Sequence, residues 1–145
     1  MKLSKQTEYG LRAAVQLARR WPREFVQSSG LAHEEGLPNK FLEAILLTLR
    51  RGGFLESKVG REGGYRLARA PRDIRVGELV RRLEGRLTAT EGRSVEELSP
   101  GEVAVHLLNA KLTQATDEVL DNMTLEQLME HTNRAASMQQ QMYYI

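Results

Sequence analysis

The chain has 145 residues, 41 % of them hydrophobic, which is enough for a compact domain with a buried core. It contains no cysteine, and this excludes disulfides, cysteine nucleophiles, cysteine-ligated zinc sites and clusters held by cysteine sulfur. No apolar run reaches the roughly eighteen residues that a membrane span requires, and the N-terminus lacks the apolar block of a signal peptide. We therefore expect a cytoplasmic protein with no membrane partner.

Charge is divided unevenly along the chain. The net charge is +2, but residues 1–85 carry +7 and residues 86–145 carry −5. This asymmetry indicates that the first part meets a polyanion such as nucleic acid, although scattered charge can also simply solvate a surface. Whether this charge binds nucleic acid or only solvates a surface depends on the fold predicted for the basic part.

Three helices are predicted in the basic part. The first covers residues 4–20, where apolar side chains recur at helical spacing, and Trp21-Pro22 ends it. A short helix follows, with Ser28 or Ser29 as its cap and Gly36 as its turn. The third covers residues 38–51 and ends at Gly52-Gly53; its expected buried face consists of Phe41, Leu42, Ile45, Leu46 and Leu49. Two short helices around a glycine turn, after a longer helix, predict a helix-turn-helix.

A β-hairpin and a further helix complete this part. Residues 54–59 and 65–68 are the predicted strands, around the loop Gly60-Arg61-Glu62-Gly63-Gly64. This loop has no following Lys-Ser/Thr pair, so a phosphate cradle is a weak interpretation and a plain loop is the simpler one. The next helix covers residues 73–84, with Asp73 as its expected cap. The order of elements predicts a mainly α fold with a small β-hairpin wing, a winged helix-turn-helix.

Double-stranded DNA is the ligand that this shape and charge predict. The N-terminal end of the second helix of a helix-turn-helix faces base edges, while flanking cations contact phosphates. Asn39 can bond an adenine edge, Lys40 a guanine or a phosphate, and Glu43 can accept a hydrogen bond from a cytosine amine; an ordinary exposed helical acid is the alternative for Glu43. The DNA-contacting candidates are Lys2, Lys5, Pro38, Asn39, Lys40, Glu43, Arg50, Lys58 and Arg61.

The acidic part begins with a strong helix signal. Ser99 is a cap, Pro100 takes the first helical position, and Glu102 follows three residues after the cap. The helix can run to residue 120 or 121, and its apolar face predicts a two-fold dimer, with a fold back onto its own domain as the alternative. The candidate dimerisation residues are Val103, Leu107, Leu108, Leu112, Ala115 and Val119. A second capping box, Thr124 to Gln127, opens a short helix with Leu128 and Met129 inward.

These elements give the expected division of the chain. Residues 1–85 form the winged helix-turn-helix, residues 86–98 a linker, residues 99–137 the dimerisation and regulatory helices, and residues 138–145 a tail. The sequence has no pattern of a catalytic nucleophile or phosphate loop, and Glu102 and His106 share a helix face without a third ligand. We expect no enzymatic activity, no metal and no cofactor.

Several motifs resemble one family of regulators. They are Met1-Lys2-Leu3-Ser4, Tyr9-Gly10-Leu11-Arg12-Ala13, Phe41-Leu42-Glu43, Gly60 with Gly63-Gly64-Tyr65-Arg66-Leu67, and Leu83-Glu84-Gly85. Together they resemble the Rrf2 family of winged-helix transcription regulators, over essentially the whole chain. The resemblance implies a DNA-contacting glutamate at Glu43. The family often has an arginine where Val59 stands here, which moves the expected wing contact to Lys58 or Arg61.

The family resemblance also raises the question of an iron–sulfur cluster. Many members bind an iron–sulfur cluster through three cysteines ahead of the long helix, and none of these is present here. Glu8 and His33 occupy positions that serve as cluster ligands in some relatives. Without sulfur ligands, we expect both to be surface residues of the DNA-binding domain.

A further resemblance is carried by Glu84-Gly85, Val119-Leu120-Asp121-Asn122, Thr124-Leu125, Met142, Tyr144 and Ile145. These residues resemble a cysteine-free branch of the family that represses genes of cysteine metabolism. The resemblance implies a protein corepressor, O-acetylserine thiol-lyase (cysteine synthase), which O-acetylserine would release. An extended tail with apolar anchors and a terminal carboxylate suits capture by a pocket of backbone N–H groups. The predicted partner-binding residues are Met142, Tyr143, Tyr144 and Ile145. The alternatives are a regulator that senses a small molecule in the dimer cleft, and a winged-helix interaction module that does not bind DNA.

Overall fold

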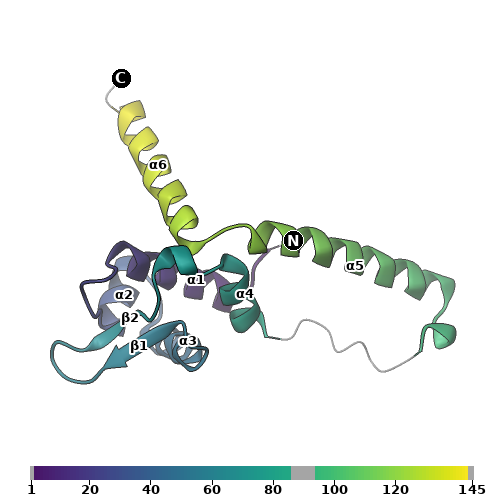
Figure 1. The fold of residues 1–145 in the computed structure, drawn as a ribbon, viewed down its shortest axis with the longest axis horizontal. Helices are drawn as coiled ribbons and strands as arrows, with labels where there is room; N and C mark the ends of the chain where they lie inside the picture. Colours follow the sequence, from purple (N-terminus) through teal and green to yellow (C-terminus); the bar gives the residue numbers. More distant parts are fainter. Residues whose placement is uncertain (1, 86–93, 144–145) are drawn as a thin grey trace.

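The computed structural model describes residues 2–85 and 94–143 and consists mainly of helices with one two-stranded antiparallel hairpin (Figure 1). Its elements are α1 (Lys5–Arg19), α2 (Ser28–Glu35), α3 (Asn39–Arg51), β1 (Leu55–Lys58), β2 (Gly64–Leu67), η1 (Pro71–Asp73), α4 (Val76–Glu84), η2 (Val95–Glu97), α5 (Pro100–Asp121) and α6 (Leu125–Tyr143). This order confirms the predicted winged helix-turn-helix followed by a long helix.

Local capping signals fix three of the helix starts. The Ser4 hydroxyl accepts a hydrogen bond from the Thr7 N–H at 3.2 Å, and the Ser99 hydroxyl does the same for the Glu102 N–H at 3.2 Å. Thr124 and Gln127 cap each other, with hydrogen bonds of 3.0 and 3.1 Å between backbone N–H and side-chain oxygen. These bonds satisfy donors that the first turn of a helix cannot pair internally.

One hydrophobic core holds the winged helix together. The apolar faces of α1, α3 and α4 meet in it, and α2 and the hairpin cover its sides. Its fully buried side chains include Leu17, Leu31, Leu42, Ile45, Leu46, Leu49, Leu67, Ile74, Leu79 and Leu125. Phe41, expected in this core, is 42 % exposed instead and packs edge-on against Tyr9, with ring centroids 5.6 Å apart.

The hairpin is attached to the segment that precedes α2. Val26 and Tyr65 exchange two backbone hydrogen bonds of 2.8 Å each, and the Gln27 side chain donates to the Arg61 carbonyl at 3.1 Å. Gly64 lies at this contact with φ +137°, and a Cβ atom there would lie 2.3 Å from the Val26 carbonyl oxygen. Only glycine fits such an approach without a backbone shift, so the position of the wing depends on this residue.

The second part of the chain returns to the winged helix at the junction of α5 and α6. The Leu125 N–H donates to the Ile74 carbonyl at 2.8 Å, and the Val76 N–H donates to the Met123 carbonyl at 2.9 Å. Arg81 binds Asp117 at 2.9 Å and Asp121 at 2.8 Å. The hydrogen bonds from Arg81 hold the pKa of the Asp121 carboxyl below its usual range. From this junction α5 and α6 project in different directions, and α5 has no buried residue (Figure 1).

Two predicted caps are wrong, and long-range pairing explains both. Gln27, not a serine, precedes α2, because pairing of Val26 with β2 keeps the chain extended until Ser28. Asp73 ends the short helix η1, and α4 starts only at Val76, because Ile74 is buried in extended conformation against Leu125. In both places a partner distant in sequence determines where the helix begins.

The C-terminal helix is longer than expected. α6 continues to Tyr143, so residues 138–143 are helical here and not an extended tail. Leu125 is its fully buried residue, while Leu128 and Met129 are half-buried. The predicted linker residues 86–93, together with Tyr144 and Ile145, lie outside the described residues. Within the described ranges, every helix is too short or too polar to cross a bilayer.

We predict that Gly64→Ala destabilises the protein by on the order of 1–3 kcal/mol, because the new Cβ would collide with the Val26 carbonyl in a left-handed backbone conformation. Urea unfolding followed by circular dichroism measures this change. Gly30→Ala is the matched control, since Gly30 lies in α2 with no atom within 4 Å of a new Cβ. It should be neutral or stabilise by up to about 1 kcal/mol. Equal effects of the two substitutions would contradict the proposed steric role of Gly64.

Candidate nucleic-acid interface

The start of α3 presents its polar residues to solvent. Pro38 precedes the helix, and Asn39, Lys40 and Glu43 lie in its first turns; all four are exposed. The opposite face is anchored in the core by Leu42, Ile45, Leu46 and Leu49. The helix is therefore held with its N-terminal polar residues outward, as a recognition helix requires.

The hairpin lies beside α3 and carries two of the predicted phosphate contacts. Lys58 ends β1 and Arg61 lies in the loop, and both are exposed. Figure 1 shows the hairpin and α3 on the side of the molecule opposite α6. The structure thus brings the start of the recognition helix and the wing cations to one side of the domain.

An aromatic residue that the sequence analysis did not single out supports the wing. The half-buried Phe25 ring lies under two cations, with its centroid 4.3 Å from the Arg66 guanidinium carbon and 5.9 Å from Lys58 Nζ. Arg66 also forms an ion pair with Glu56 across the hairpin. Cation–π attraction orients both cations at the base of the wing. The sequence shows an aromatic residue just before the helix-turn-helix, but it does not show that this residue contacts the wing.

Among the residues that the structure describes, several basic side chains of the domain are held in ion pairs, but the candidate DNA-contacting cations of α3 and of the wing are not. Arg12, Arg20, Arg66, Arg69 and Arg81 all form ion pairs with acidic side chains. In the part of the chain that the structure describes, none of the ion pairs involves Lys40, Arg50, Lys58 or Arg61. Cations without an internal counterion are available to replace the counterions of a phosphate backbone.

The N-terminal lysines lie elsewhere. Lys2 and Lys5 are exposed, and Lys5 forms a 3.7 Å ion pair with Glu8. The Ser4 N–H, between these two lysines, donates to Glu84 Oε1 at 3.0 Å, which places this segment at the end of α4. The structure therefore brings together the candidate DNA-contacting residues of α3 and of the wing, but not Lys2 and Lys5. The phosphate contacts of these two lysines stay a prediction.

The helix-turn-helix is anchored to α1 through Glu35. Arg12 donates to one carboxylate oxygen of Glu35 at 2.8 Å and Gln16 to the other at 2.7 Å. Burial acts to raise the pKa of Glu35, but these hydrogen bonds and the Arg12 charge outweigh it and lower the pKa. The carboxylate therefore stays ionised and fixes the end of α2 against α1.

Glu43 has a partner on the neighbouring helix. The Ser28 hydroxyl, at the first residue of α2, donates to Glu43 Oε1 at 3.3 Å. The bond restricts the rotamers of an otherwise exposed side chain. Ser28 had been predicted only as a possible cap, so its position beside Glu43 comes from the structure alone.

A three-helix core, a helix-turn-helix with exposed polar residues at its second helix, and an adjacent cationic hairpin define a DNA-binding regulator of the winged-helix class. Comparison with known proteins agrees with this class. Residues 3–131 match the Rrf2 family, described as iron-dependent transcriptional regulators, and the chain belongs to this family.

Relatives and solved structures match over nearly the whole chain. An rrf2-like HTH-type transcriptional regulator from Rhodobacter capsulatus is 32 % identical over 146 residues, 94 % of this chain and 97 % of the relative. The HTH-type regulator CymR of Bacillus subtilis is 32 % identical over 145 residues, the full length of both chains. The solved structure of CymR, described as the global cysteine regulator of B. subtilis, has a TM-score of 0.75 at 30 % identity and covers 90 % of this chain and 98 % of its own. T. potens IscR has a TM-score of 0.76 at 32 % identity, with 93 % and 90 % covered.

The residues of this chain do not fit the iron site that the family description implies. Iron–sulfur clusters are held mainly by cysteine thiolates, and the sequence has no cysteine. Residues 2–85 and 94–143 contain no group of three or more His, Asp or Glu side chains that could hold a metal ion. Glu8 faces Lys5 and Arg12 at 3.7 and 3.9 Å, and His33 is exposed. Thiolate-bound iron is therefore excluded as the signal that this chain senses.

Base contacts and phosphate contacts should respond differently to substitution. We predict that Lys40→Ala and Arg61→Ala weaken binding to all DNA sequences and each reduce the salt dependence by about one counterion. Glu43→Ala should instead relax base preference, by about 1–3 kcal/mol at one position. Ser28→Ala should cause part of the same relaxation, because it frees the Glu43 side chain.

Selection from a random DNA pool, followed by titration at several salt concentrations, measures both effects. Ser29→Ala is the control, because Ser29 is exposed and makes no side-chain hydrogen bond within the described residues. A uniform loss of affinity for Glu43→Ala would contradict the predicted role of Glu43 in base specificity. A Ser28→Ala profile identical to that of Ser29→Ala would contradict the orienting role of Ser28.

Proposed function

We propose that the protein is a homodimeric, sequence-specific repressor of cysteine and sulfur metabolism genes, with O-acetylserine thiol-lyase as its corepressor. One observation carries the dimeric part of this proposal: α5 extends away from the winged helix with an apolar stripe that no other described element covers. The DNA-binding part follows from the exposed start of α3 and the unpaired cations beside it.

The apolar stripe of α5 has the spacing of a helix-to-helix seam. Val105, Leu108, Leu112, Ala115 and Val119 follow one another at alternating intervals of three and four residues, which is a heptad pattern. The four larger side chains are between 38 % and 63 % exposed. A second α5 offers an identical stripe, so a two-fold dimer buries both. Such a dimer would present two recognition helices to successive major-groove segments of a palindrome.

The stripe differs in part from the dimerisation residues expected from sequence. Leu108, Leu112, Ala115 and Val119 belong to it. Because an α-helix turns by about 100° per residue, Val103 and Leu107 project from other sides of α5. Val105 belongs to the stripe instead. Leu107 is 61 % exposed and therefore offers a surface leucine outside the proposed seam.

The side chains at the start of α3 and the cations of the hairpin would have different roles in DNA recognition. Asn39 and Glu43 would contact base edges, Lys40 a guanine or a phosphate, and Lys58 and Arg61 phosphates beside the groove. Arg50, exposed at the far end of α3, would contact the backbone next to it.

The link to cysteine metabolism rests on relatives and on composition. CymR matches the full length of this chain, and the absence of cysteine sets the chain apart from cluster-binding members of the family. The thiol-lyase would bind the segment Met142, Tyr143, Tyr144 and Ile145. Figure 1 shows α6 projecting from the winged helix, which places the end of this helix away from α3 and the hairpin. Because α6 is helical to Tyr143, capture as an extended peptide would require its last turn to unwind.

We predict that Leu112→Glu converts the dimer to a monomer, because the substitution places a carboxylate in the centre of an apolar seam. Dimer affinity should fall by roughly a hundredfold or more. Analytical ultracentrifugation measures the change, and operator affinity should fall with it. Leu107→Glu, with the same change of chemistry outside the stripe, should remain dimeric. Dimers of equal stability in both variants would show that the seam lies elsewhere.

We predict that deletion of residues 143–145 abolishes binding of O-acetylserine thiol-lyase and leaves binding to bare operator DNA unchanged. Calorimetry with the purified enzyme and mobility shifts with the operator measure the two affinities. Replacement of residues 139–141 by alanine is the control, since it changes the same region but keeps the proposed anchors. Unchanged enzyme binding after the deletion would refute the role of this segment.

A further inference from the structure

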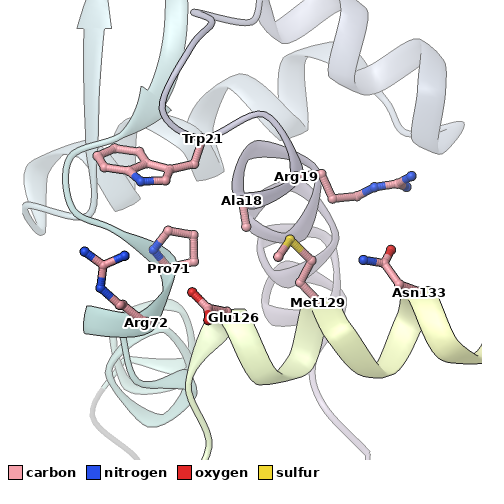
Figure 2. Close-up of a pocket in the computed structure, with 8 residues that line it drawn as sticks. All are labelled: Ala18, Arg19, Trp21, Pro71, Arg72, Glu126, Met129 and Asn133. Atoms are coloured by element: carbon pink, nitrogen blue, oxygen red, sulfur yellow. The ribbon is translucent and has the colours of Figure 1, made fainter.

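A cavity of about 350 Å³ lies where α6 crosses the end of α1 and the short helix η1. It is lined by Ala18, Arg19, Trp21, Pro71, Arg72, Glu126, Met129 and Asn133 (Figure 2). Its volume falls in the range of sites that hold small metabolites. The DNA-binding role uses none of these side chains.

Four of the residues that line the cavity are apolar, and their positions are well supported. Ala18 and Pro71 are buried, and Trp21 and Met129 are half-buried. The Trp21 N–H donates to the Ala18 carbonyl at 3.2 Å, which holds the indole-bearing residue against the end of α1. The hydrogen bond from Leu125 to Ile74 keeps the start of α6 next to η1. The cavity is therefore formed by segments whose backbones are already fixed.

Two side chains of opposite charge, Arg72 and Glu126, also line the cavity. Figure 2 shows Arg72 and Glu126 at the cavity, with Trp21 and Met129 around it, while the Arg19 guanidinium points away. In the described part of the chain, neither Arg72 nor Glu126 forms an ion pair or a side-chain hydrogen bond. Each side chain thus retains its capacity for a charged partner, and the two do not satisfy each other.

We propose that this cavity binds a small zwitterion of the α-amino acid class. Arg72 would bind the carboxylate, for which its planar donors are suited, and Glu126 would bind the ammonium group. The ligand side chain would lie against Trp21 and Met129. A simple anion would leave Glu126 unused, and a simple cation would leave Arg72 unused.

A ligand held in this way connects η1 to α6. Occupancy therefore stabilises the attachment of α6 to the winged helix, and through the α5–α6 junction the orientation of α5. The site lies within one chain, is separate from the α5 seam, and does not depend on the proposed corepressor.

The test uses the full chain and its intrinsic fluorescence. Trp21 is the single tryptophan of the sequence, so a change in its emission reports directly on the cavity. The proteinogenic L-α-amino acids are titrated one at a time. We expect a saturable change with at least one of them. The best binder is then compared with its deaminated and decarboxylated analogues, for leucine isocaproate and isoamylamine, and both should bind roughly tenfold more weakly or worse.

Two substitutions separate the proposed contacts. Arg72→Ala should weaken binding of the amino acid by roughly tenfold or more, and Glu126→Gln should remove the advantage over the deaminated analogue. Arg51→Ala, an exposed arginine at the end of α3, should bind like the wild type. Thermal unfolding followed by circular dichroism checks that each variant is folded. The proposal is overturned if no amino acid gives a saturable change, or if folded Arg72→Ala binds as tightly as the wild type.

Discussion

Burial of Leu125 joins the acidic part of the chain to the basic part. Its side chain is fully enclosed in the winged-helix core, and its N–H pairs with the Ile74 carbonyl. Removal of a leucine side chain from water contributes about 1.5–3 kcal/mol. Arg81 adds ion pairs between α4 and the last turns of α5, through Asp117 and Asp121. Both α5 and α6 extend from this junction. The long helix can therefore project from the domain without losing a defined position relative to α3.

The sequence allowed the main elements to be predicted because their signals are local. Apolar periodicity located α1, α3 and α5, and the capping residues Ser99 and Thr124 marked helix starts that the structure confirms. Ser28 and Asp73 carry the same kind of signal but do not cap helices. The difference is that extended segments precede α2 and α4 and pair with Tyr65 and Leu125. A partner tens of residues away cannot be recognised from a capping motif.

The candidate interface could be predicted only where it follows from helix position. The N-terminal residues of α3 face outward because the apolar spacing of α3 fixes its buried face, and this spacing is visible in the sequence. The hydrogen bond of Ser28 to Glu43 and the stacking of Arg66 on Phe25 depend on how separate segments meet, so no linear pattern marks them.

The attachment of the hairpin to the chain before α2 limits how the protein can adapt to its ligand. With Val26 bonded to Tyr65 and Gln27 to Arg61, the distance between α3 and the loop is set by covalent and hydrogen-bonded geometry. The start of α3 and the loop of the hairpin therefore keep a fixed spacing within one chain. In the proposed dimer, variation in half-site spacing would be absorbed by bending of the duplex or by a change in the crossing angle of the two long helices.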